Sequence, residues 1–563
     1  MNNGNGHARG GATWTVPADV APGATLLDAL RDEGIVVPAD CGGVGTCGLC
    51  AVRVVPASEP SAADLDHIDS PRIAQGWRLA CGVAARPGMV AHLPEDATRV
   101  PASAREKKGR RSSGERADSP AAAPPAPKRS GIALAVDLGT TTVAAALVSL
   151  PGGEILAEAS APNTQRPYGG DVVSRIEYGS RGPAELGRLR DAAVESLRAA
   201  AAAACRAAGV RQTQIDGGAI ACNPTMAHLL LGANPAPLGR APFRLAVEGT
   251  LILAGKRIGF PGAPDALVTL LPAVSATLGG DAVGGAVALG FDRVGHDPRL
   301  LVDVGTNTEI VLAIPGRKRV LAASAASGGA FEGAAIACGM RAEAGAVTAA
   351  GWSGDDLTLT VVGGGAARGI SGSGLLDLVA LLLRFGIVDP SGRLLGRDAL
   401  FGSAPPALLG RLLPGRDGDI RFLVSRAPGR TVTLSSADLR QLQLAKGAVR
   451  AALDLMLEEA GISPRDVAEV AVAGAFGAGI AEESAVATGL FPEDFRGKFT
   501  QGGNASLRAA VETLRDGRFA GRVDAFARRI RPLSLPDLPE FPARFLAAME
   551  FARDSQVFPP FRR

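Results

Sequence analysis

Four cysteines near the start of the chain restrict most strongly what it can fold into. Cys41, Cys47 and Cys50 lie in one glycine-rich stretch, with five and then two residues between them, and Cys81 follows after thirty more. Four cysteine thiolates are the ligand set of a [2Fe–2S] cluster. The glycines fit this use, because a loop that wraps a cluster needs positive φ angles and backbone N–H groups directed at sulfur. The sequence therefore predicts a [2Fe–2S] cluster bound by these four residues.

Two other uses of the cysteines compete with a cluster. A structural zinc site usually takes its cysteines as two close pairs, whereas here three stand together and one apart. Disulfides are less favoured, because residues 1–6 are polar and contain no apolar signal segment, which indicates a reducing, cytoplasmic location. The three remaining cysteines, Cys205, Cys222 and Cys338, stand in Ala-rich or Gly-rich apolar contexts. We expect them to be buried small hydrophobic residues.

Composition narrows the class of protein further. The 563 residues are enough for three or four domains, and 47% hydrophobic with 20% charged residues is typical of a globular protein. A net charge of +3 gives no reason to expect nucleic acid as a partner. The longest apolar run, near residues 375–383, is far shorter than the ~18 residues that span a membrane, so we expect no membrane partner.

Residues 13–98 have the pattern of a small ferredoxin domain. Strands are expected at residues 13–16, 51–55 and 89–93. Thr25 and Asp28 have capping-box spacing at the start of a helix, and Gly34 is placed to end it. This is the α+β layout of a β-grasp ferredoxin. Residues 1–12 contain no strand pattern, so we expect a disordered N-terminus and a shortened opening hairpin.

A linker is expected at residues 99–130. From residue 101 on it has no Leu, Ile, Val, Phe, Tyr or Trp, and it contains eight basic and three acidic residues. Such a segment cannot bury a core and should be disordered. Two uses remain open: the linker carries the cluster between two docking positions, or it is a solubilising spacer.

From residue 131 to residue 563 the pattern changes to a long α/β domain with an internal repeat. An apolar strand at residues 132–136 is followed by a polar turn at 137–142 and a returning strand at 143–147. The same order recurs at residues 300–313, which indicates a duplication. Helices are expected at about residues 185–208 and from the capping box at Ser435 and Asp438 to Gly461. A third glycine-rich loop, residues 470–477, follows the second helix.

The two turns share an Asp-x-Gly-Thr pattern that suits phosphate binding. The glycine lets backbone N–H groups converge on an anion, and the threonines add neutral donors. Asp137 and Asp303 are candidates to bind Mg²⁺ through water and to orient the attacking water, with no choice between them as base. A single such turn would be weak evidence, because tight turns often use these residues. Two turns and a third glycine-rich loop together predict a nucleotide site.

The chain resembles a known group of proteins. Residues 137–142, 303–307 and 474–477 are similar to the phosphate-1, phosphate-2 and adenosine motifs of the actin/sugar-kinase/heat-shock ATPase superfamily. The whole chain is similar to the reductive activators of corrinoid proteins, which join an N-terminal [2Fe–2S] domain to such an ATPase. Further stretches match in the same order: residues 163–176, 223–232, 327–340, 369–377, 441–446 and 503–505.

The resemblance implies a two-lobed ATPase domain with duplicated mixed sheets and a defined set of site residues. Asp137 and Asp303 would be catalytic. ATP would be bound by Gly139, Thr140, Thr141, Thr142, Gly305, Thr306, Asn307, Gly372, Ser373, Gly374, Gly474, Ala475, Phe476 and Gly477.

The resemblance also implies a reaction and partners. The protein would use ATP and Mg²⁺ to return an electron from its cluster to the inactive Co(II) form of a corrinoid protein or corrinoid-dependent methyltransferase, regenerating Co(I). An upstream donor (a ferredoxin, a flavodoxin or a reductase) would recharge the cluster, and a homodimer is suggested. Three alternatives stay open: an activator of another low-potential metalloenzyme, a ferredoxin tethered to a nucleotide-sensing domain, and a sugar kinase.

Three further residues in matching stretches have two interpretations each. Glu332 is either catalytic or partner-contacting, or else a solvated or capping residue. His228 precedes three leucines and is expected to be a hydrogen-bonded core residue rather than a ligand. Lys446 lies on a predicted helix and either approaches the nucleotide or, by default, is exposed at the surface.

Overall fold

The structure is a computed structural model, and it describes most of the chain. The described residues are 13–33, 35–37, 39, 43, 45, 48–94, 98–99, 131–293, 295, 297–314, 319–400, 402–415, 419–427, 430–477 and 479–552. The predicted disordered N-terminus lies outside them, as does the predicted linker except for Arg99, so neither prediction is tested. Cys41 and Cys47 also lie outside them.

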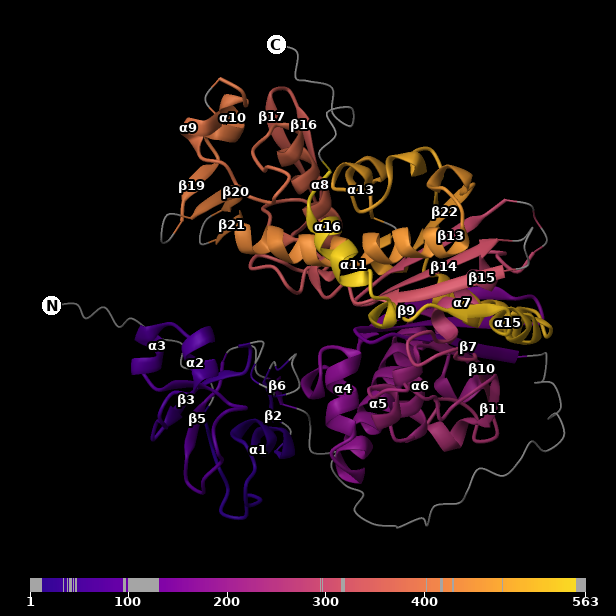
Figure 1. The fold of residues 1–563 in the computed structure, drawn as a ribbon. Helices are drawn as coiled ribbons and strands as arrows, with labels where there is room; N and C mark the ends of the chain where they lie inside the picture. Colours follow the sequence, from indigo (N-terminus) through magenta and orange to yellow (C-terminus); the bar gives the residue numbers. More distant parts are fainter. Residues whose placement is uncertain are drawn as a thin grey trace.

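The ferredoxin domain is built on a four-stranded sheet (Figure 1). Its antiparallel neighbours, in order, are β1 (Thr13–Thr15), β5 (Val90–His92), β3 (Ala51–Val55) and β4 (Trp77–Leu79). Leu26, Leu27 and Leu30 of α1 (Leu26–Asp32) are buried in the core of this domain. The smaller elements are β2 (Ile35–Val36), α2 (Ala62–His67), α3 (Ser70–Ala74) and β6 (Thr98–Arg99). The predicted strands are confirmed to within a residue at each end.

The predicted cap of the first helix is confirmed, because the Thr25 side chain accepts a hydrogen bond from the backbone N–H of Asp28. Strand β6 pairs with β2, so the described part of this domain includes Arg99, one residue beyond the predicted boundary.

The first lobe of the ATPase region contains a six-stranded mixed sheet. Its order is β11 (Leu251–Ala254), β12 (Leu267–Leu270), β10 (Ile215–Cys222), β7 (Gly131–Leu138), β8 (Thr142–Leu150) and β9 (Glu154–Pro162). Strands β7, β8 and β9 form an antiparallel meander, and β10 runs parallel to β7. Helices α5 (Pro183–Ala208) and α6 (Pro224–Leu231) bury apolar residues in one core with this sheet, beside α4 (Val172–Gly179).

The second lobe repeats this plan, which confirms the predicted duplication. Its sheet has the order β23 (Phe499–Gly503), β22 (Glu469–Ala473), β13 (Arg299–Val304), β14 (Thr308–Ile314), β15 (Arg319–Ala325) and β24 (Ile530–Pro532). Strands β13, β14 and β15 form the meander, and β22 runs parallel to β13 as β10 does to β7. In both lobes the tight turn between the first two strands contains the predicted Gly-Thr pair.

The second lobe carries two additional small sheets and most of the remaining helices. The sheets are formed by β16 (Ala346–Ser353), β17 (Asp356–Val361) and β18 (Gly369–Ile370), and by β19 (Leu412–Pro414), β20 (Ile420–Ala427) and β21 (Arg430–Ser435). The helices are α8 (Gly372–Arg384), α9 (Arg397–Leu400), α10 (Pro406–Leu409), α11 (Ser436–Ala460), α12 (Gly474–Gly477), α13 (Glu482–Ala487), α14 (Ala505–Arg515), α15 (Phe519–Ala527) and α16 (Phe541–Met549).

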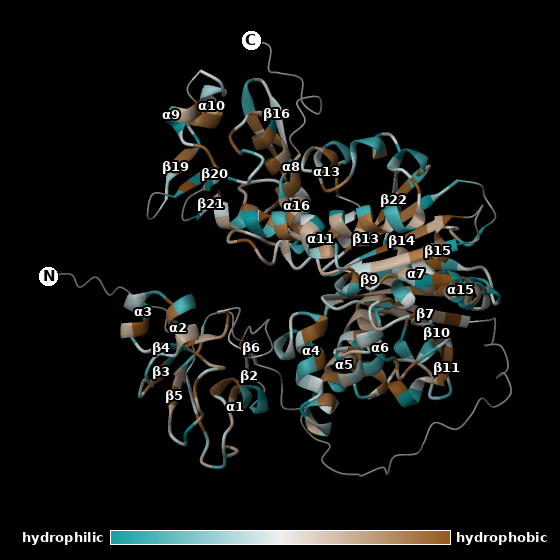
Figure 2. Cartoon of the chain, in the orientation of Figure 1, coloured by the Kyte–Doolittle hydropathy of each residue, from teal (hydrophilic) through white to brown (hydrophobic). Residues whose placement is uncertain are grey.

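Both long helices predicted from the sequence are present. Helix α11 begins after a capping box made by Ser435 and Asp438 and ends at Gly461, as predicted. Helix α5 begins two residues earlier than predicted, at Pro183, and ends at Gly209. Central strands of both large sheets are mainly hydrophobic, as expected for strands buried on both faces (Figure 2). Among the described residues, no helix is long and apolar enough to cross a membrane.

The two lobes share a core that contains α14 and α7 (Gly280–Ala288). Apolar residues from both sheets meet there, including Ala135 of β7 and Leu301 of β13. A Cβ atom added at Gly284 would lie 2.8 Å from Leu271 Cδ1 and 2.9 Å from Ala509 Cβ. Glycine is therefore the residue that lets α7 approach α14 so closely.

We expect Gly284→Ala to destabilise the protein, because overpacking a buried contact typically costs about 1–3 kcal/mol. The matched control is Gly187→Ala in α5, where no atom lies within 4 Å of the added methyl group. Replacing a helical glycine by alanine at an open position adds up to about 1 kcal/mol of stability. Thermal unfolding should show a lower Tm for the first variant only. An equal or higher Tm for Gly284→Ala would contradict the close packing.

Candidate functional site

Two of the four predicted cluster ligands lie among the described residues: Cys50, at the end of the cluster loop (residues 41–50), and Cys81. Cys50 and Cys81 have their sulfur atoms 3.4 Å apart. That separation is too long for a disulfide bond of about 2.05 Å, and it suits two thiolates on one metal ion. Gly43, Gly45 and Gly48 have φ angles of 106°, 87° and 68°, as predicted for a loop that wraps a cluster. The described part of the loop therefore fits the group that the sequence predicts.

The first phosphate turn, residues 139–142, is held in place by side chains from three later segments. Asn163 Nδ2 donates to Gly139 O (2.9 Å), and Asn163 N donates to Thr141 O (3.0 Å). Arg175 Nη2 donates to Thr140 O (2.6 Å), and Asn223 Nδ2 donates to Thr140 Oγ1 (3.0 Å). These bonds fix the backbone of the turn, so its N–H groups and hydroxyls keep fixed directions.

The second phosphate turn, residues 305–307, is anchored in a similar way. Ser327 Oγ donates to Gly305 O (3.0 Å), and Gly328 N donates to Thr306 O (2.9 Å). A Cβ atom at Gly305 would lie only 3.1 Å from Asn307 O, so the turn is tight at the predicted glycine. In each lobe a segment just after the meander therefore supports the phosphate turn.

Glu332 connects the two phosphate turns. Its carboxylate accepts hydrogen bonds from Thr306 Oγ1 (2.5 Å) and from Thr141 Oγ1 (3.0 Å), and the two hydroxyl oxygens are 3.4 Å apart. The two turns therefore face each other across the lobes, as the resemblance implies. The half-buried Glu332 is therefore more than a solvated side chain, since its carboxylate bridges two site threonines, and a catalytic or partner-contacting role stays a prediction.

Four carboxyl groups gather at the same place, and we call Asp137, Asp281, Asp303 and Glu309 the carboxylate cluster. Burial raises the pKa of Asp303 to about 7, and Asp281 and Asp137 add to this rise. Burial likewise raises the pKa of Asp281 to about 7 and that of Glu309 well above its ordinary value. Crowded carboxyl groups with raised pKa values are typical of functional sites, and among the described residues no group of three or more His, Cys, Asp or Glu side chains is arranged to hold a metal ion.

Asp137 is held by the start of α14. Ser506 Oγ donates to Asp137 Oδ1 (2.8 Å), and Asn504 Nδ2 donates to Oδ2 (2.9 Å). Burial raises the pKa of Asp137, and these two hydrogen bonds partly oppose the rise. Two side chains from the later part of the chain, at the start of α14, therefore hold Asp137, a predicted catalytic residue of the first lobe.

The predicted adenosine motif lies beside Asp303, but its shape differs from the prediction. Residues 474–477 form one helical turn, α12, instead of a loop, because the chain turns directly from β22 into a helix. Gly474 has a φ of 91°, and a Cβ atom there would lie 2.6 Å from Asp303 Oδ1. The structure therefore brings this motif to the carboxylate cluster. The side chains of Ala475 and Phe476 lie outside the described residues.

Gly372, Ser373 and Gly374 serve packing at the start of α8. Gly372 lies against the Phe331 carbonyl, and Gly374 lies against the Val347 carbonyl, so closely that neither position has room for a Cβ atom. Ser373 Oγ donates to Thr348 O (2.9 Å). Since Phe331 precedes Glu332, these residues support the bridge from behind. Their contact with nucleotide stays a prediction.

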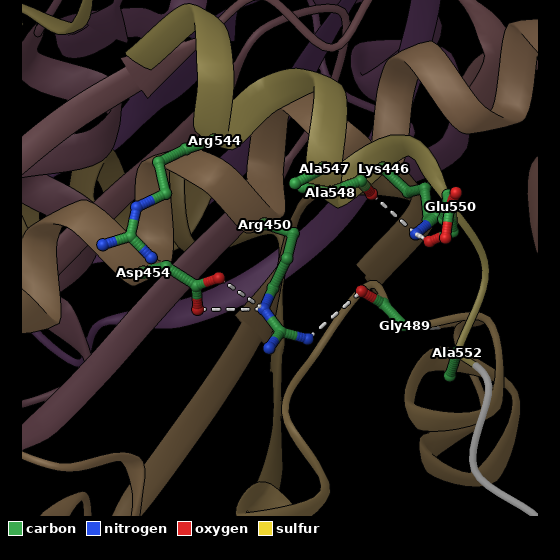
Figure 3. A pocket seen from close by; sticks show the side chains of 9 residues that line it. All are labelled: Lys446, Arg450, Asp454, Gly489, Arg544, Ala547, Ala548, Glu550 and Ala552. Carbon is green, nitrogen blue, oxygen red and sulfur yellow. Dashed lines mark hydrogen bonds and ion pairs between the residues drawn. The ribbon is translucent and has the colours of Figure 1, made fainter. Parts of the chain in front are cut away.

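Lys446 is buried, so the default expectation of a surface lysine is wrong. Its side chain is 1% exposed, and Nζ donates to Glu550 O and to Ala548 O (2.7 Å). Burial lowers the pKa of Lys446 to about 7. It lines an open cavity of about 470 Å³ between α11 and the chain around α16, where Arg450 pairs with Asp454 (Figure 3). None of the predicted nucleotide residues lines this cavity.

His228 and the three cysteines outside the predicted cluster contribute mainly to packing. His228 is 1% exposed; its Nδ1 lies 2.7 Å from Pro224 O, and its Nε2 accepts from Ala246 N (3.0 Å). The prediction of a hydrogen-bonded core histidine is confirmed. Cys205 and Cys222 are buried as predicted, whereas Cys338 is only partly buried beside the core.

Sequence reasoning missed several residues of the site. Asp281 and Glu309 complete the carboxylate cluster, and Asn163 and Arg175 hold the first phosphate turn. For Asp281 the sequence contained a clue, because the residue follows two consecutive glycines, Gly279 and Gly280. In the structure the backbones of these glycines pack against Cys222 and Leu271. Arg175 gave no such signal, since an arginine inside a helix is normally exposed.

The fold and the site define a class: a [2Fe–2S] ferredoxin domain joined to an actin/sugar-kinase/heat-shock (ASKHA) domain. Comparison with known proteins agrees. Residues 13–86 match the 2Fe-2S iron-sulfur cluster binding domain, residues 132–294 the RACo middle region, and residues 297–562 the C-terminal domain of RACo, the ASKHA domain. The chain belongs to the RACo family of reductive activators of corrinoid proteins.

Individual relatives support the same family. The corrinoid activation enzyme RamQ of Eubacterium limosum is 33% identical over 428 residues, which cover 75% of this chain and 71% of that protein. The Co(II) methylated amine-specific corrinoid protein reductase of Methanosarcina barkeri is 27% identical over 281 residues, 46% of each chain. A solved structure of a reductive activator for corrinoid, iron-sulfur protein has a TM-score of 0.69 at 26% identity, covering 96% of this chain and 98% of that one.

We expect Cys50→Ala to prevent cluster assembly without changing nucleotide binding, because the ligand and the phosphate turns belong to separate cores. After anaerobic reconstitution, visible absorption, and EPR once the protein has been reduced, should show cluster in the wild type and almost none in the variant. Cys205→Ala is the control, since Cys205 is a buried residue of α5. A full cluster signal in Cys50→Ala would remove this residue from the ligand set.

Asp303→Asn should change the pH dependence of stability. The folded protein keeps the Asp303 proton up to about pH 7, whereas the unfolded chain releases it near 3.8, so stability falls as pH rises between these values. The amide removes this loss, and we expect a Tm a few degrees higher than wild type at pH 8, without nucleotide. Affinity for Mg²⁺–ATP should fall at least tenfold. Asp398→Asn, at an exposed position, is the control. A lower Tm with unchanged affinity would contradict the assignment.

Proposed function

We propose that this protein returns one electron from its [2Fe–2S] cluster to the inactive Co(II) form of a corrinoid protein or corrinoid methyltransferase, regenerating Co(I), and that ATP drives the transfer. The observation that carries the proposal is the Glu332 bridge between two phosphate turns, in a chain that also holds a ferredoxin domain and belongs to the RACo family. A sugar kinase would have no use for the cluster.

The phosphate turns would bind ATP between the lobes. Backbone N–H groups of residues 139–142 and 305–307 would hold the phosphates, with the hydroxyls of Thr141 and Thr306 as further donors. Asp137 and Asp303 would hold Mg²⁺, in part through water, and orient the attacking water. Bound Mg²⁺ supplies charge neutralisation for the phosphates. Residues 474–477 would lie at the adenosine end of the nucleotide.

Glu332 is placed to report the presence of phosphate. Its carboxylate accepts from the two hydroxyls that a phosphate would also use, and carboxylate and phosphate are both anions. The two cannot share these donors without strong repulsion. Phosphate binding would therefore displace Glu332, and η7, the turn Ala330–Glu332 that carries it, lies against the start of α8. Binding of phosphate would thus shift η7 and, through it, the packing at the start of α8 in the second lobe.

A thermodynamic gap explains why a cluster and an ATPase share one chain. Plant-type [2Fe–2S] clusters have potentials near about −400 mV, and each ~59 mV by which the donor falls short costs tenfold in a one-electron equilibrium. An uphill transfer needs a second source of free energy, which differential binding of ATP and its products to two conformations can supply.

The partners follow from the reaction. The acceptor is a corrinoid protein or corrinoid-dependent methyltransferase, and a ferredoxin, flavodoxin or reductase recharges the cluster. We place the protein in the cytoplasm because thiolate cluster ligands suit a reducing compartment. A homodimer through the ATPase region is part of the proposal.

The decisive experiment mixes the reduced protein with a Co(II) corrinoid protein, with and without Mg²⁺–ATP, and follows the cobalt spectrum. We expect Co(I) to appear at least tenfold faster and further with ATP, and not to appear with Cys50→Ala. The matched control is the Cys205→Ala variant, which should behave as wild type. Equal Co(I) formation without ATP, or none under any condition, would refute the proposal.

A further inference from the structure

The ferredoxin domain touches the ATPase region through one end of α1. The Arg31 guanidinium lies over two rings, 5.7 Å from the Tyr168 centroid and 5.6 Å from the Tyr178 centroid. Its Nη2 also donates to the carbonyl of Pro167, and the residue is only 7% exposed. A cation between two tyrosine faces is a specific contact that an arginine makes well, because its planar group stacks while it donates.

A second contact lies beside the first. Asp32 Oδ1 accepts from Arg188 Nη2 (2.5 Å), and Arg188 Nη1 donates to the Tyr178 hydroxyl (3.2 Å). The tyrosine that stacks on Arg31 is thus also held by the partner of Asp32. We call Arg31 and Asp32, with Tyr168, Tyr178 and Arg188, the latch.

The latch lies next to the cluster loop. A Cβ atom at Gly43 would be 3.8 Å from Arg31 Nη1 and 3.8 Å from the Cβ of Cys81. The same face of the ferredoxin domain therefore carries a cluster ligand and the residue that docks on the ATPase region. Docking and release at the latch would therefore change whether the cluster loop lies against the ATPase region or is exposed to solvent and other proteins.

A strap, residues 163–175, connects the latch to the first phosphate turn. Tyr168 lies in the strap, and the next residue, Gly169, accepts a hydrogen bond from Arg175 Nε (2.8 Å). The same guanidinium donates through Nη2 to Thr140 O (2.6 Å), and Asn163, at the other end of the strap, bonds the turn twice. One short segment thus touches both the ferredoxin domain and the phosphate turn.

The latch is built for reversible contact. Arg31 Nε and Nη1 are buried and have no hydrogen-bond partner among the described residues, although Nη1 lies 3.6 Å from Asp28 Oδ1. Buried donors without acceptors oppose docking, because water satisfies them when the domains separate. The stacking and the ion pair favour docking, so the two states are closer in free energy than in a fully satisfied interface.

We propose that the latch couples docking of the ferredoxin domain to nucleotide binding at the first phosphate turn, so that each favours the other. This inference rests on the proposed nucleotide site. Docking holds Pro167 and Tyr168, and with them the strap that fixes Gly139, Thr140 and Thr141. A turn fixed in advance loses less conformational freedom when phosphate binds. By reciprocity, nucleotide then strengthens docking by the same factor.

The test measures affinity for a non-hydrolysable ATP analogue with Mg²⁺, and the radius of gyration by small-angle scattering, on the full reconstituted chain. Arg31→Ala should raise the Kd about fivefold or more, the low end of typical coupling, and should increase the radius of gyration. The analogue should compact the wild type but not the variant. Arg72→Ala is the matched control, since Arg72 stacks on Trp77 within the ferredoxin domain (4.1 Å) and should leave both values unchanged.

A double-mutant cycle tests the second contact. Asp32→Ala and Arg188→Ala should each raise the Kd, and the double variant should be no worse than the weaker-binding single variant, because both remove one ion pair. Additive effects, an unchanged or lower Kd in Arg31→Ala, or an unchanged radius of gyration would each overturn the proposal. Neither readout involves cobalt. If the latch variants show no effect, the proposed corrinoid reduction is not affected. If corrinoid reduction fails, the affinity and the radius of gyration still test the latch.

Discussion

The bridge from Glu332 to the hydroxyls of Thr141 and Thr306 is the interaction on which the rest of the site depends. It joins two phosphate turns that are far apart in the sequence, and it sets the separation of the two lobes where nucleotide would bind. Phe331 beside it packs on Gly372, so the bridge is also fixed to α8. A carboxylate in this position accepts from the two hydroxyls that are proposed to bind phosphate, so a bound phosphate would compete with Glu332 for these donors.

Around this bridge the structure places carboxyl groups whose negative charge a bound cation would compensate. The carboxylate cluster is partly buried, and mutual repulsion and desolvation favour its protonated forms. A divalent cation would reverse that preference. Asn504 and Ser506, which come from the far end of the chain, hold one of its members. Both lobes therefore contribute to one electrostatic centre, and closing or opening them alters it as a unit.

The strap extends this centre toward the electron-transfer domain. Its side chains and one backbone N–H donate hydrogen bonds to backbone carbonyls of the first phosphate turn, and its tyrosine Tyr168 lies against Arg31 of the ferredoxin domain. A family whose task joins an ATPase to a cluster needs a physical route between the two. In this chain the proposed route is short, since it runs through the residues between Asn163 and Arg175.

The sequence by itself determined the parts that depend on local pattern: the [2Fe–2S] domain from its cysteine spacing, the ferredoxin strands from alternation, the two Gly-Thr turns, and the long helices from caps and periodicity. These features are set by neighbours a few residues away. Only the tertiary structure decided that Asp281 and Glu309 join Asp137 and Asp303, that Glu332 bridges the turns, that Lys446 is buried, and that Arg31 docks on two tyrosines. Each of these depends on side chains brought together by folding from segments up to hundreds of residues apart, and local spacing does not encode such meetings.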